Sequence, residues 1–228
     1  MMGCGNMTRD QTSRKATGDA PATAVIVAHP DDEVLWAGGT ILMHPRWRWS
    51  VLSLCRASDQ DRAPKFAKVM DLLGAVGRMG DLDDGPEQAP LGAELVQNTI
   101  LSLLPAAKFD LVFTHSPFGE YTRHRRHEET ARAVLTLWES GRLSTTELRM
   151  FAYKDGHKRH PPRPIASAHQ IVELPQGVWQ EKYLMLTAIY GYSTDSFEAR
   201  TTPRKEAFWC FRSPAEAAGW MRERRSEK

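Results

Sequence analysis

The feature that most constrains this chain is a short apolar run that stops abruptly at a histidine, a proline and two carboxylates. Residues 24–28 are apolar and rich in β-branched side chains, and His29-Pro30-Asp31-Asp32 follows directly. An unbroken apolar run of this kind is typical of a parallel strand that is buried on both faces. A helical pattern starts immediately afterwards. We therefore expect a strand, a loop and a helix, with the loop at the sheet edge where open α/β sheets bind ligands.

The loop after this strand offers one imidazole and two hard oxygen donors. Pro30 fixes its own φ and restricts His29 to an extended conformation, so the backbone sets the direction of the imidazole. Two neighbouring aspartates cannot easily point the same way, so one can bind a cation while the other stays free as a base. A histidine and an aspartate suit zinc or another divalent first-row metal. The alternative is a polar turn in which Asp31 or Asp32 caps the helix. The complete segment, at the end of a buried strand, favours the metal site.

The rest of the chain alternates between strand and helix patterns. Further strands are expected at residues 49–55, 109–115 and 148–153, and helices near residues 66–73, 91–104 and 125–137. This alternation predicts an α/β fold with a parallel sheet and right-handed crossovers. The loop at residues 81–86 carries three aspartates before Gly85 and Pro86, a pattern more typical of a turn than of a metal cage.

Two segments flank this alternation. Residues 1–21 are polar and rich in small side chains, and we expect a disordered leader there. Residues 22–228 make up the expected domain, including a C-terminal extension that packs on the same sheet. The extension shows patterns for a strand at 170–174, a helix at 178–190, a strand at 207–211 and a helix from Pro214.

Charge and cysteine content argue against several classes of protein. A net charge of +2 and a pI near 8.5 give no strong case for nucleic-acid or membrane binding. Cys4, Cys55 and Cys210 lack the spacing of a disulfide framework or of a cysteine-ligated zinc site, and we expect the last two to be buried and reduced. No apolar stretch approaches the ~20 residues that span a bilayer, and no signal-peptide core is visible. We therefore expect a cytoplasmic protein.

A third metal ligand is expected from the end of another strand. Residues 114–129 contain three histidines, His115, His124 and His127. At the start of a helix, His124 and His127 lie three residues apart and can face the same way. Taken alone, this spacing in a basic helix start is more typical of surface histidines. Because the first loop also offers metal ligands at the end of a strand, we favour a metal site shared by the two segments. His115 is then either close to the ligands or simply a core histidine.

The two segments together resemble a known family. Ala28-His29-Pro30-Asp31-Asp32-Glu33, followed far along the chain by His124-Arg125-Arg126-His127, looks like the PIG-L/LmbE-like family of metal-dependent N-acetylglucosaminyl deacetylases. The resemblance covers residues 23–190. It implies a single Rossmann-like α/β domain, with helices on both faces of a mostly parallel sheet. It also implies a zinc-dependent hydrolase that removes an N-acetyl group from an N-acetylglucosamine-type sugar derivative, with Fe2+ as the other candidate metal.

The resemblance also assigns roles to individual residues. It implies that His29, Asp32 and His127 bind Zn2+. Asp31 would be the general base, and His124 would polarise the carbonyl or stabilise the oxyanion. The expected contacts to substrate are Arg62, Glu120 and Tyr121.

The chain departs from the commoner family pattern in two places. Arg125-Arg126 stands between the two histidines, where the family often has Pro-Asp, and this leaves the ligand positions intact. The glutamate that often follows three residues after the arginine at position 62 is replaced by Lys65. From its position alone, Arg62 is more typical of a solvent-facing loop residue, and the contact with the sugar is what the resemblance implies.

Other functions stay open from sequence alone. One is a non-catalytic sugar- or nucleotide-binding Rossmann-like module with an idle metal site, but an idle site has no need of the free base Asp31. Another is a metal-dependent hydrolase of a different bond, such as a phosphoester, which commonly uses two metals. The expected partner is a small-molecule N-acetyl amino sugar, without nucleic acid or a membrane span. The sequence leaves the oligomeric state open, a homo-oligomer included.

Overall fold

The computed structural model describes residues 20–122 and 124–226. The expected leader, residues 1–21, lies outside the described residues except for Ala20 and Pro21. Within the described part of the chain, no helix is both long enough and apolar enough to cross a membrane.

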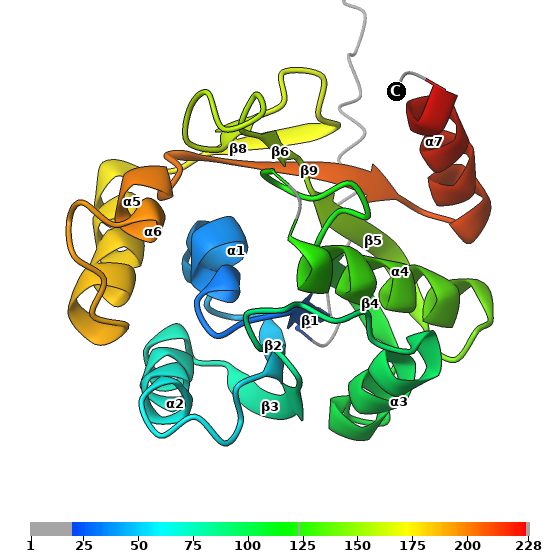
Figure 1. Ribbon diagram of the computed structural model, residues 1–228, viewed down its shortest axis with the longest axis horizontal. Coiled ribbons are helices and arrows are strands. Elements are labelled where there is room, and N and C mark those ends of the chain that lie inside the picture. The colour runs from blue at the N-terminus through cyan, green and yellow to red at the C-terminus, as the bar shows by residue number, and fades with distance from the viewer. Residues whose placement is uncertain (1–19, 123, 227–228) are drawn as a thin grey trace, which may run out of the picture.

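The core of the molecule is a central sheet, in which the described residues form seven strands in the order β3-β2-β1-β4-β5-β9-β8 (Figure 1). The strands are β1 Ala22–Val27, β2 Arg48–Cys55, β3 Val76–Leu82, β4 Phe109–Thr114, β5 Thr145–Phe151, β8 Gln170–Glu173 and β9 Lys205–Phe211. The first five in sequence pair in parallel, and β9 and β8 add antiparallel pairs at one edge. The prediction of a mostly parallel α/β sheet is confirmed.

Helices cover both faces of this sheet, as predicted. Figure 1 shows α1, α2 and α5 on one side and α3, α4 and α7 on the other. The helices are α1 Asp32–Met43, α2 Arg62–Leu73, α3 Ala93–Leu103, α4 Arg125–Glu139, α5 Gln176–Leu184, α6 Phe197–Thr201 and α7 Pro214–Ser226. Because both faces are covered, β1 is buried along nearly its whole length, and this explains its unbroken apolar sequence.

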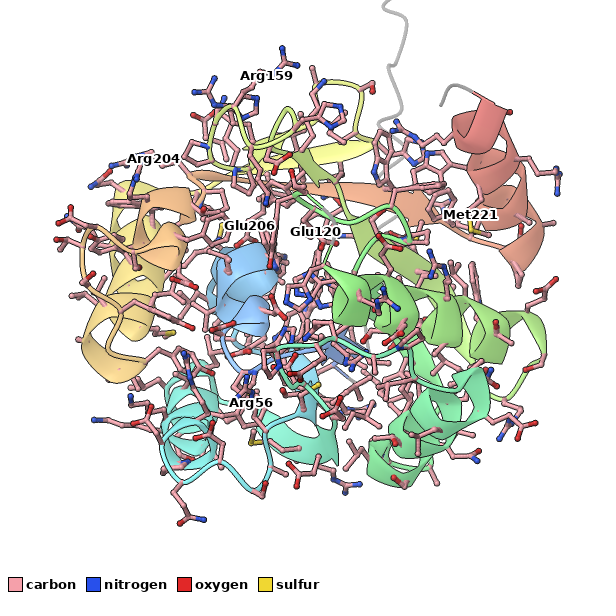
Figure 2. The ribbon with its side chains drawn as sticks, in the orientation of Figure 1. Arg56, Glu120, Arg159, Arg204, Glu206 and Met221 are labelled. Carbon is pink, nitrogen blue, oxygen red and sulfur yellow. The ribbon has the colours of Figure 1, made fainter. Side chains whose placement is uncertain are left out.

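The C-terminal extension contacts α1 through Glu206, which also takes part in a fully buried ion pair within the extension. The Lys182 ammonium on α5 lies 2.6 Å from the Glu206 carboxylate on β9. Glu206 also accepts hydrogen bonds from the backbone N–H groups of Gly39 and Thr40, and Figure 2 shows it beside α1. A Cβ at position 39 would lie within 3.0 Å of the Leu174 methyl groups and of Glu206 Oε1, so any larger residue there would have to displace the Leu174 side chain.

Three local expectations differ from the structure. Residues 76–82 form the edge strand β3, for which the sequence predicts no strand. Two glycines and two charged residues, which are uncommon in strands, interrupt the strand pattern there. The expected strand at 148–153 ends as β5 at Phe151, and residues 153–154 form the short β6, which pairs with β7 Arg163–Pro164. The expected helix at 178–190 divides into α5 and a π-helical turn, η1 Met185–Ile189.

Candidate metal centre and active site

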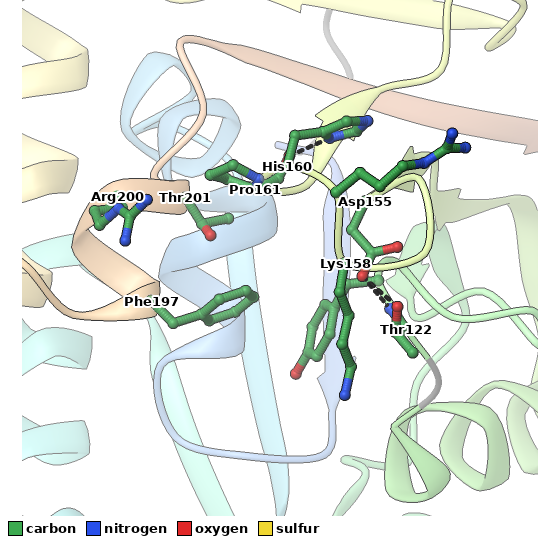
Figure 3. Close-up of a pocket in the computed structure, with 10 residues that line it drawn as sticks. Thr122, Asp155, Lys158, His160, Pro161, Phe197, Arg200 and Thr201 are labelled. Carbon is green, nitrogen blue, oxygen red and sulfur yellow. Dashed lines mark hydrogen bonds between the residues drawn. The ribbon is translucent and has the colours of Figure 1, made fainter.

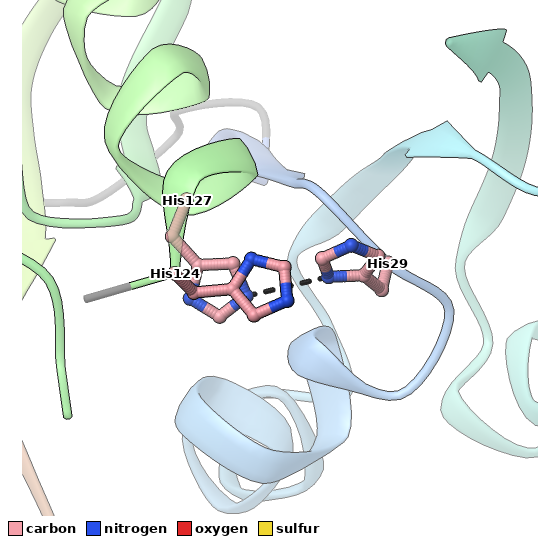
Figure 4. A group of neighbouring side chains, drawn as sticks. All are labelled: His29, His124 and His127. Atoms are coloured by element: carbon pink, nitrogen blue, oxygen red, sulfur yellow. Dashed lines mark hydrogen bonds between the residues drawn. The ribbon is translucent and has the colours of Figure 1, made fainter. Parts of the chain in front are cut away.

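The candidate site lies where the strand order reverses. β1 is flanked by β2 on one side and by β4 on the other, and this switch point is the usual ligand crevice of an open α/β sheet. His29 follows β1, and His115 follows β4. The start of α4 brings His124 and His127 to the same edge of the sheet as His29, although His29 is far from both in the sequence (Figure 4).

Three side-chain atoms meet at this point. His29 Nδ1 lies 3.1 Å from Asp32 Oδ2 and 3.3 Å from His127 Nε2. His127 Nε2 lies 3.3 Å from Asp32 Oδ2. Four ligands at the usual distances around a tetrahedral zinc ion are separated from each other by about 3.3 Å. The three residues therefore fit a single divalent cation.

Each of the two histidines has a carboxylate on its other nitrogen. His29 Nε2 lies 3.1 Å from Asp84 Oδ1, and His127 Nδ1 lies 2.8 Å from Glu120 Oε2. An ionised carboxylate only accepts hydrogen bonds, so each ring can keep a proton on that nitrogen and offer the other nitrogen to a metal ion at the shared point. Burial raises the pKa of Glu120, but the imidazoles of His115 and His127 outweigh this effect and lower it to about 2.

Asp32 is oriented in a similar way by the core. The Trp36 indole donates a hydrogen bond to Asp32 Oδ1 at 3.0 Å, and this leaves Oδ2 to face the two histidines. Burial raises the pKa of Asp32, but the neighbouring His127 and His115 imidazoles hold it well below its usual range. The carboxylate is therefore the charged oxygen donor of the site.

His115 packs against the cluster of His29, Asp32 and His127. Its ring is fully buried and stacks on His127, with centroids 3.8 Å apart. The Ala28 N–H donates to His115 Nε2 at 3.0 Å, so this lone pair is already engaged. His115 therefore fits a supporting position behind the ligands better than a position among them.

Asp31 is held apart from the metal cluster by an unusual backbone conformation. Its φ is +118°, a region that L-residues rarely adopt. Its carboxylate contacts the Tyr192 hydroxyl and lies 3.3 Å from the Arg62 guanidinium. Burial and the neighbouring Asp32 charge raise the pKa of Asp31 to about 7. The side chain makes no capping hydrogen bond to α1, which argues against the alternative of a simple helix cap.

His124 is the N-cap residue of α4. It lines a cavity over the metal cluster, together with His29, Asp31 and Asp32. Burial, together with the nearby His127 and His29, lowers the pKa of His124 to about 3. Among the described residues, its buried Nδ1 has no hydrogen-bond partner. These observations favour a neutral imidazole over the imidazolium form.

The expected substrate residues separate into two groups. Arg62 and Tyr121 line a cavity of about 230 Å³ over the metal cluster, so Arg62 is not simply a solvent-facing loop residue. Glu120 is fully buried beneath His127 and does not line this cavity. The expectation that Glu120 contacts substrate is therefore corrected: its carboxylate faces the His115 and His127 rings.

Sequence reasoning missed two residues of the site. The sequence predicts a turn near Asp84, and a turn forms there, but the Asp84 carboxylate also lies 3.1 Å from His29 Nε2 and 2.7 Å from the Arg56 guanidinium. The fully buried Arg126 places this loop by donating to the Asp83 carbonyl, so the departure from the family pattern at position 126 has a structural role here. Tyr192 gave no signal in the sequence, because its contact with Asp31 joins segments that are 161 residues apart.

Comparison with known proteins identifies the family of this chain. A family profile, PIG-L, described as GlcNAc-PI de-N-acetylase, matches residues 24–138, which is half of the chain. The chain belongs to the PIG-L family. The matched segment runs from β1 almost to the end of α4, so it includes both loops of the PIG-L site.

An uncharacterized protein of Acanthamoeba polyphaga mimivirus is 24% identical over 124 residues, 48% of this chain and 55% of that protein. The PIG-L chain thus spans about half the length of this relative.

Solved structures share the fold at low sequence identity. N,N'-diacetylchitobiose deacetylase from Pyrococcus horikoshii aligns over 85% of both chains, with a TM-score of 0.62 and 17% identity. The zinc-inhibited teicoplanin deacetylase Orf2 aligns over 84% of this chain and 98% of its own, with a TM-score of 0.62 and 14% identity. The 4-carboxy-2-hydroxymuconate hydratase from Pseudomonas putida aligns over 83% and 95%, with a TM-score of 0.53 and 15% identity. Since a hydratase shares this fold with deacetylases, the chemistry has to be argued from the site.

Proposed function

We propose that this PIG-L protein hydrolyses the acetamide of an N-acetylglucosamine-type sugar derivative, with a divalent ion held by His29, Asp32 and His127. Zinc is the first candidate, and Fe2+ is the second. The observation that carries the proposal is the convergence of three donor atoms within 3.1–3.3 Å of one another. The family description and the two deacetylases that share the fold support an acetylated sugar as the substrate.

Asp31 has the position and the proton affinity of a general base. When bound, a divalent ion in such a site polarises an amide carbonyl and lowers the pKa of water toward ~7. Asp31 accepts a proton from the attacking water, and its pKa of about 7 suits this transfer near neutral pH. Arg62 and Tyr192 hold its carboxylate at the cavity wall. The proton then passes to the leaving nitrogen as the C–N bond breaks, and the products are acetate and the amino sugar.

His124 is suited to a different role. Its neutral ring lines the cavity beside the metal cluster, at 4.7 Å between the centroids of His124 and His29. A neutral imidazole N–H directed at the acetamide oxygen stabilises the negative charge that develops there during attack. Tyr121 and Arg62 line the walls of the cavity and would contact the sugar.

A substrate panel tests this proposal. The metal content of the purified protein is measured, and acetate release is followed with N-acetylglucosamine derivatives, alongside an Asp31→Ala control. We expect close to one divalent ion per chain, and acetate release that the control loses almost completely. Failure to release acetate from every member of the panel by metal-loaded protein would contradict the proposal. Acetate release that persists at the full rate in the control would remove Asp31 as the base.

A further inference from the structure

A second, larger cavity lies next to the candidate active site. Its volume is about 600 Å³. It shares Tyr121 and Phe197 with the cavity over the metal cluster, so the two cavities have a common aromatic rim. The two rings lie 5.0 Å apart at an angle of 58°. A substrate whose sugar occupies the first cavity can therefore extend past this rim into the second.

The two cavities differ in their charged groups. Both signs of charge line the first cavity, where Arg56 pairs with Asp84 and Arg62 with Asp31. The second cavity is lined by Lys158, Arg159 and Arg200 and, among the residues that the structure describes, by the single carboxylate of Asp155. Within residues 20–122 and 124–226, neither the Lys158 ammonium nor the Arg200 guanidinium takes part in an ion pair or a side-chain hydrogen bond. Unneutralised cations on the wall of a concave site raise the local concentration of anions.

The acidic residue in the second cavity does not cancel this charge. Asp155 is mostly buried, and its carboxylate accepts hydrogen bonds from the Thr122 N–H at 2.6 Å and the Thr122 hydroxyl at 2.5 Å. It also accepts the His157 N–H at 3.0 Å. Figure 3 shows its bonds to Thr122 at one wall of the cavity. The carboxylate is thus committed to holding the loop.

The loop that carries Lys158 is built in a strained conformation. Gly156, His157 and Lys158 are consecutive residues with positive φ, at 62°, 60° and 65°. For non-glycine residues such a conformation costs about 1–3 kcal/mol each and persists where surrounding contacts enforce it, often at ligand sites. Asp155 provides these contacts. The result is that Lys158 extends into the cavity opposite Phe197 (Figure 3).

From these observations we propose that the second cavity binds a negatively charged group, a phosphate or a carboxylate, that is covalently linked to the amino sugar in the first cavity. The inference rests on the proposed function because it describes the same substrate. Lys158 and Arg200 bind the anionic group, and Asp155 is a positioning residue that holds Lys158 in place. The first cavity pairs its carboxylates with Arg56 and Arg62 and receives the uncharged acetamido sugar, whereas the second has an excess of cations, and this difference sets the direction in which the substrate binds.

The test compares glycosides of N-acetylglucosamine that differ only at the end of the same short linker, which carries a hydroxyl, a carboxylate or a phosphate. Binding to the metal-free protein is measured by calorimetry, and acetate release by the metal-loaded protein is measured separately. We expect at least one anionic glycoside to bind about ten- to a hundredfold more tightly than the hydroxyl glycoside, as is typical of charged hydrogen bonds. The anionic glycoside that binds more tightly identifies the group as a phosphate or a carboxylate. Added salt should reduce the difference in affinity between the anionic and the hydroxyl glycosides.

Matched variants attribute the preference to the cavity. The double variant Lys158→Gln/Arg200→Gln should lose the preference and keep its affinity for the hydroxyl glycoside. Lys108→Gln removes a charge immediately before β4, at the opposite end of that strand from the site, and should keep the preference. Equal binding of all three glycosides, no measurable binding of any, or a preference that survives in the double variant would overturn the proposal.

The two proposals fail in different ways. Preferential binding of an anionic glycoside without acetate release from any glycoside would support the anion site and contradict the deacetylase. Acetate release at equal efficiency from all three glycosides, together with equal binding, would support the deacetylase and contradict the anion site.

Discussion

The carboxylate of Glu33 accepts a hydrogen bond from the backbone N–H of Asp31, at 2.9 Å. Glu33 is fully buried, and its other oxygen accepts a hydrogen bond from the Tyr190 hydroxyl at 2.6 Å. Tyr190 directly follows the π-helical turn η1. Through Glu33, the C-terminal part of the chain therefore contacts the segment that carries the general base Asp31. The contact helps to hold Asp31 at its φ of +118°.

Removal of this contact should therefore displace the base. We predict that Glu33→Ala lowers kcat about a hundredfold, the typical cost of misplacing a catalytic group by about an ångström, with metal affinity changed much less. Glu33→Gln keeps an acceptor for the Asp31 N–H and should retain most of the activity. Steady-state acetate release and metal titration measure these effects. Equal losses in both variants would contradict the role given to this hydrogen bond.

The ligand assignment distinguishes His127 from His124. His127→Ala removes one of the three converging donors, so we predict loss of stoichiometric zinc and of activity. His124→Ala should retain the zinc but lose about 10²–10³ in kcat, as expected for an oxyanion donor. Competition with a chromogenic chelator gives the affinity, and acetate release gives the rate. Full zinc stoichiometry in His127→Ala would disprove its role as a ligand.

The buried Glu120 should affect the metal without touching the substrate. Glu120→Gln weakens the hydrogen bond that fixes the His127 ring, and we predict a ten- to hundredfold loss of zinc affinity. Glu94→Gln, in the first turn of α3, is the control and should leave the affinity unchanged. If KM for the sugar rises in Glu120→Gln while zinc affinity stays constant, the assignment of Glu120 to direct substrate contact would have to be restored.

The ion pair between Lys182 and Glu206 predicts an asymmetric effect on stability. Glu206→Ala leaves a buried ammonium without its partner, and we expect the free energy of unfolding to fall by about 3–5 kcal/mol. The double variant Lys182→Met/Glu206→Leu removes both charges and should lose less than Glu206→Ala alone. Urea unfolding of the three proteins measures the difference. A larger loss in the double variant would show that the bonds of Glu206 to α1 dominate over the charge pair.

Cys55 gives a prediction about pH. Burial raises the pKa of its thiol from 9.0 to about 12, so the folded protein keeps the proton over a range in which the unfolded chain releases it. This group therefore favours the folded state fully below pH 9, and its contribution is lost as the pH rises toward 12. At pH 8.5 we predict that iodoacetamide modifies Cys55 only after unfolding. Mass spectrometry of the Cys55 peptide, with and without urea, measures this, and rapid labelling of the native protein would contradict it.

The sequence by itself determined the elements that short-range patterns specify. An unbroken apolar run ending at His29 specified a buried parallel strand, because only a strand covered on both faces needs apolar residues at every position. The spacing of His124 and His127 at a helix start placed both rings on one side of α4. The alternation of strands and helices specified the parallel sheet, and the two segments together indicated the family to which the chain belongs.

The tertiary structure decided what depends on distant partners. The proximity of Asp84 to His29, of Tyr192 to Asp31 and of Lys182 to Glu206 arises from packing between elements, and no local pattern carries that information. Glu120 shows the difference most clearly, since a glutamate near a catalytic motif fits a pocket wall or a buried partner equally well in sequence. Its burial against two imidazoles decides between them, because a carboxylate without contact to water needs partners of this kind.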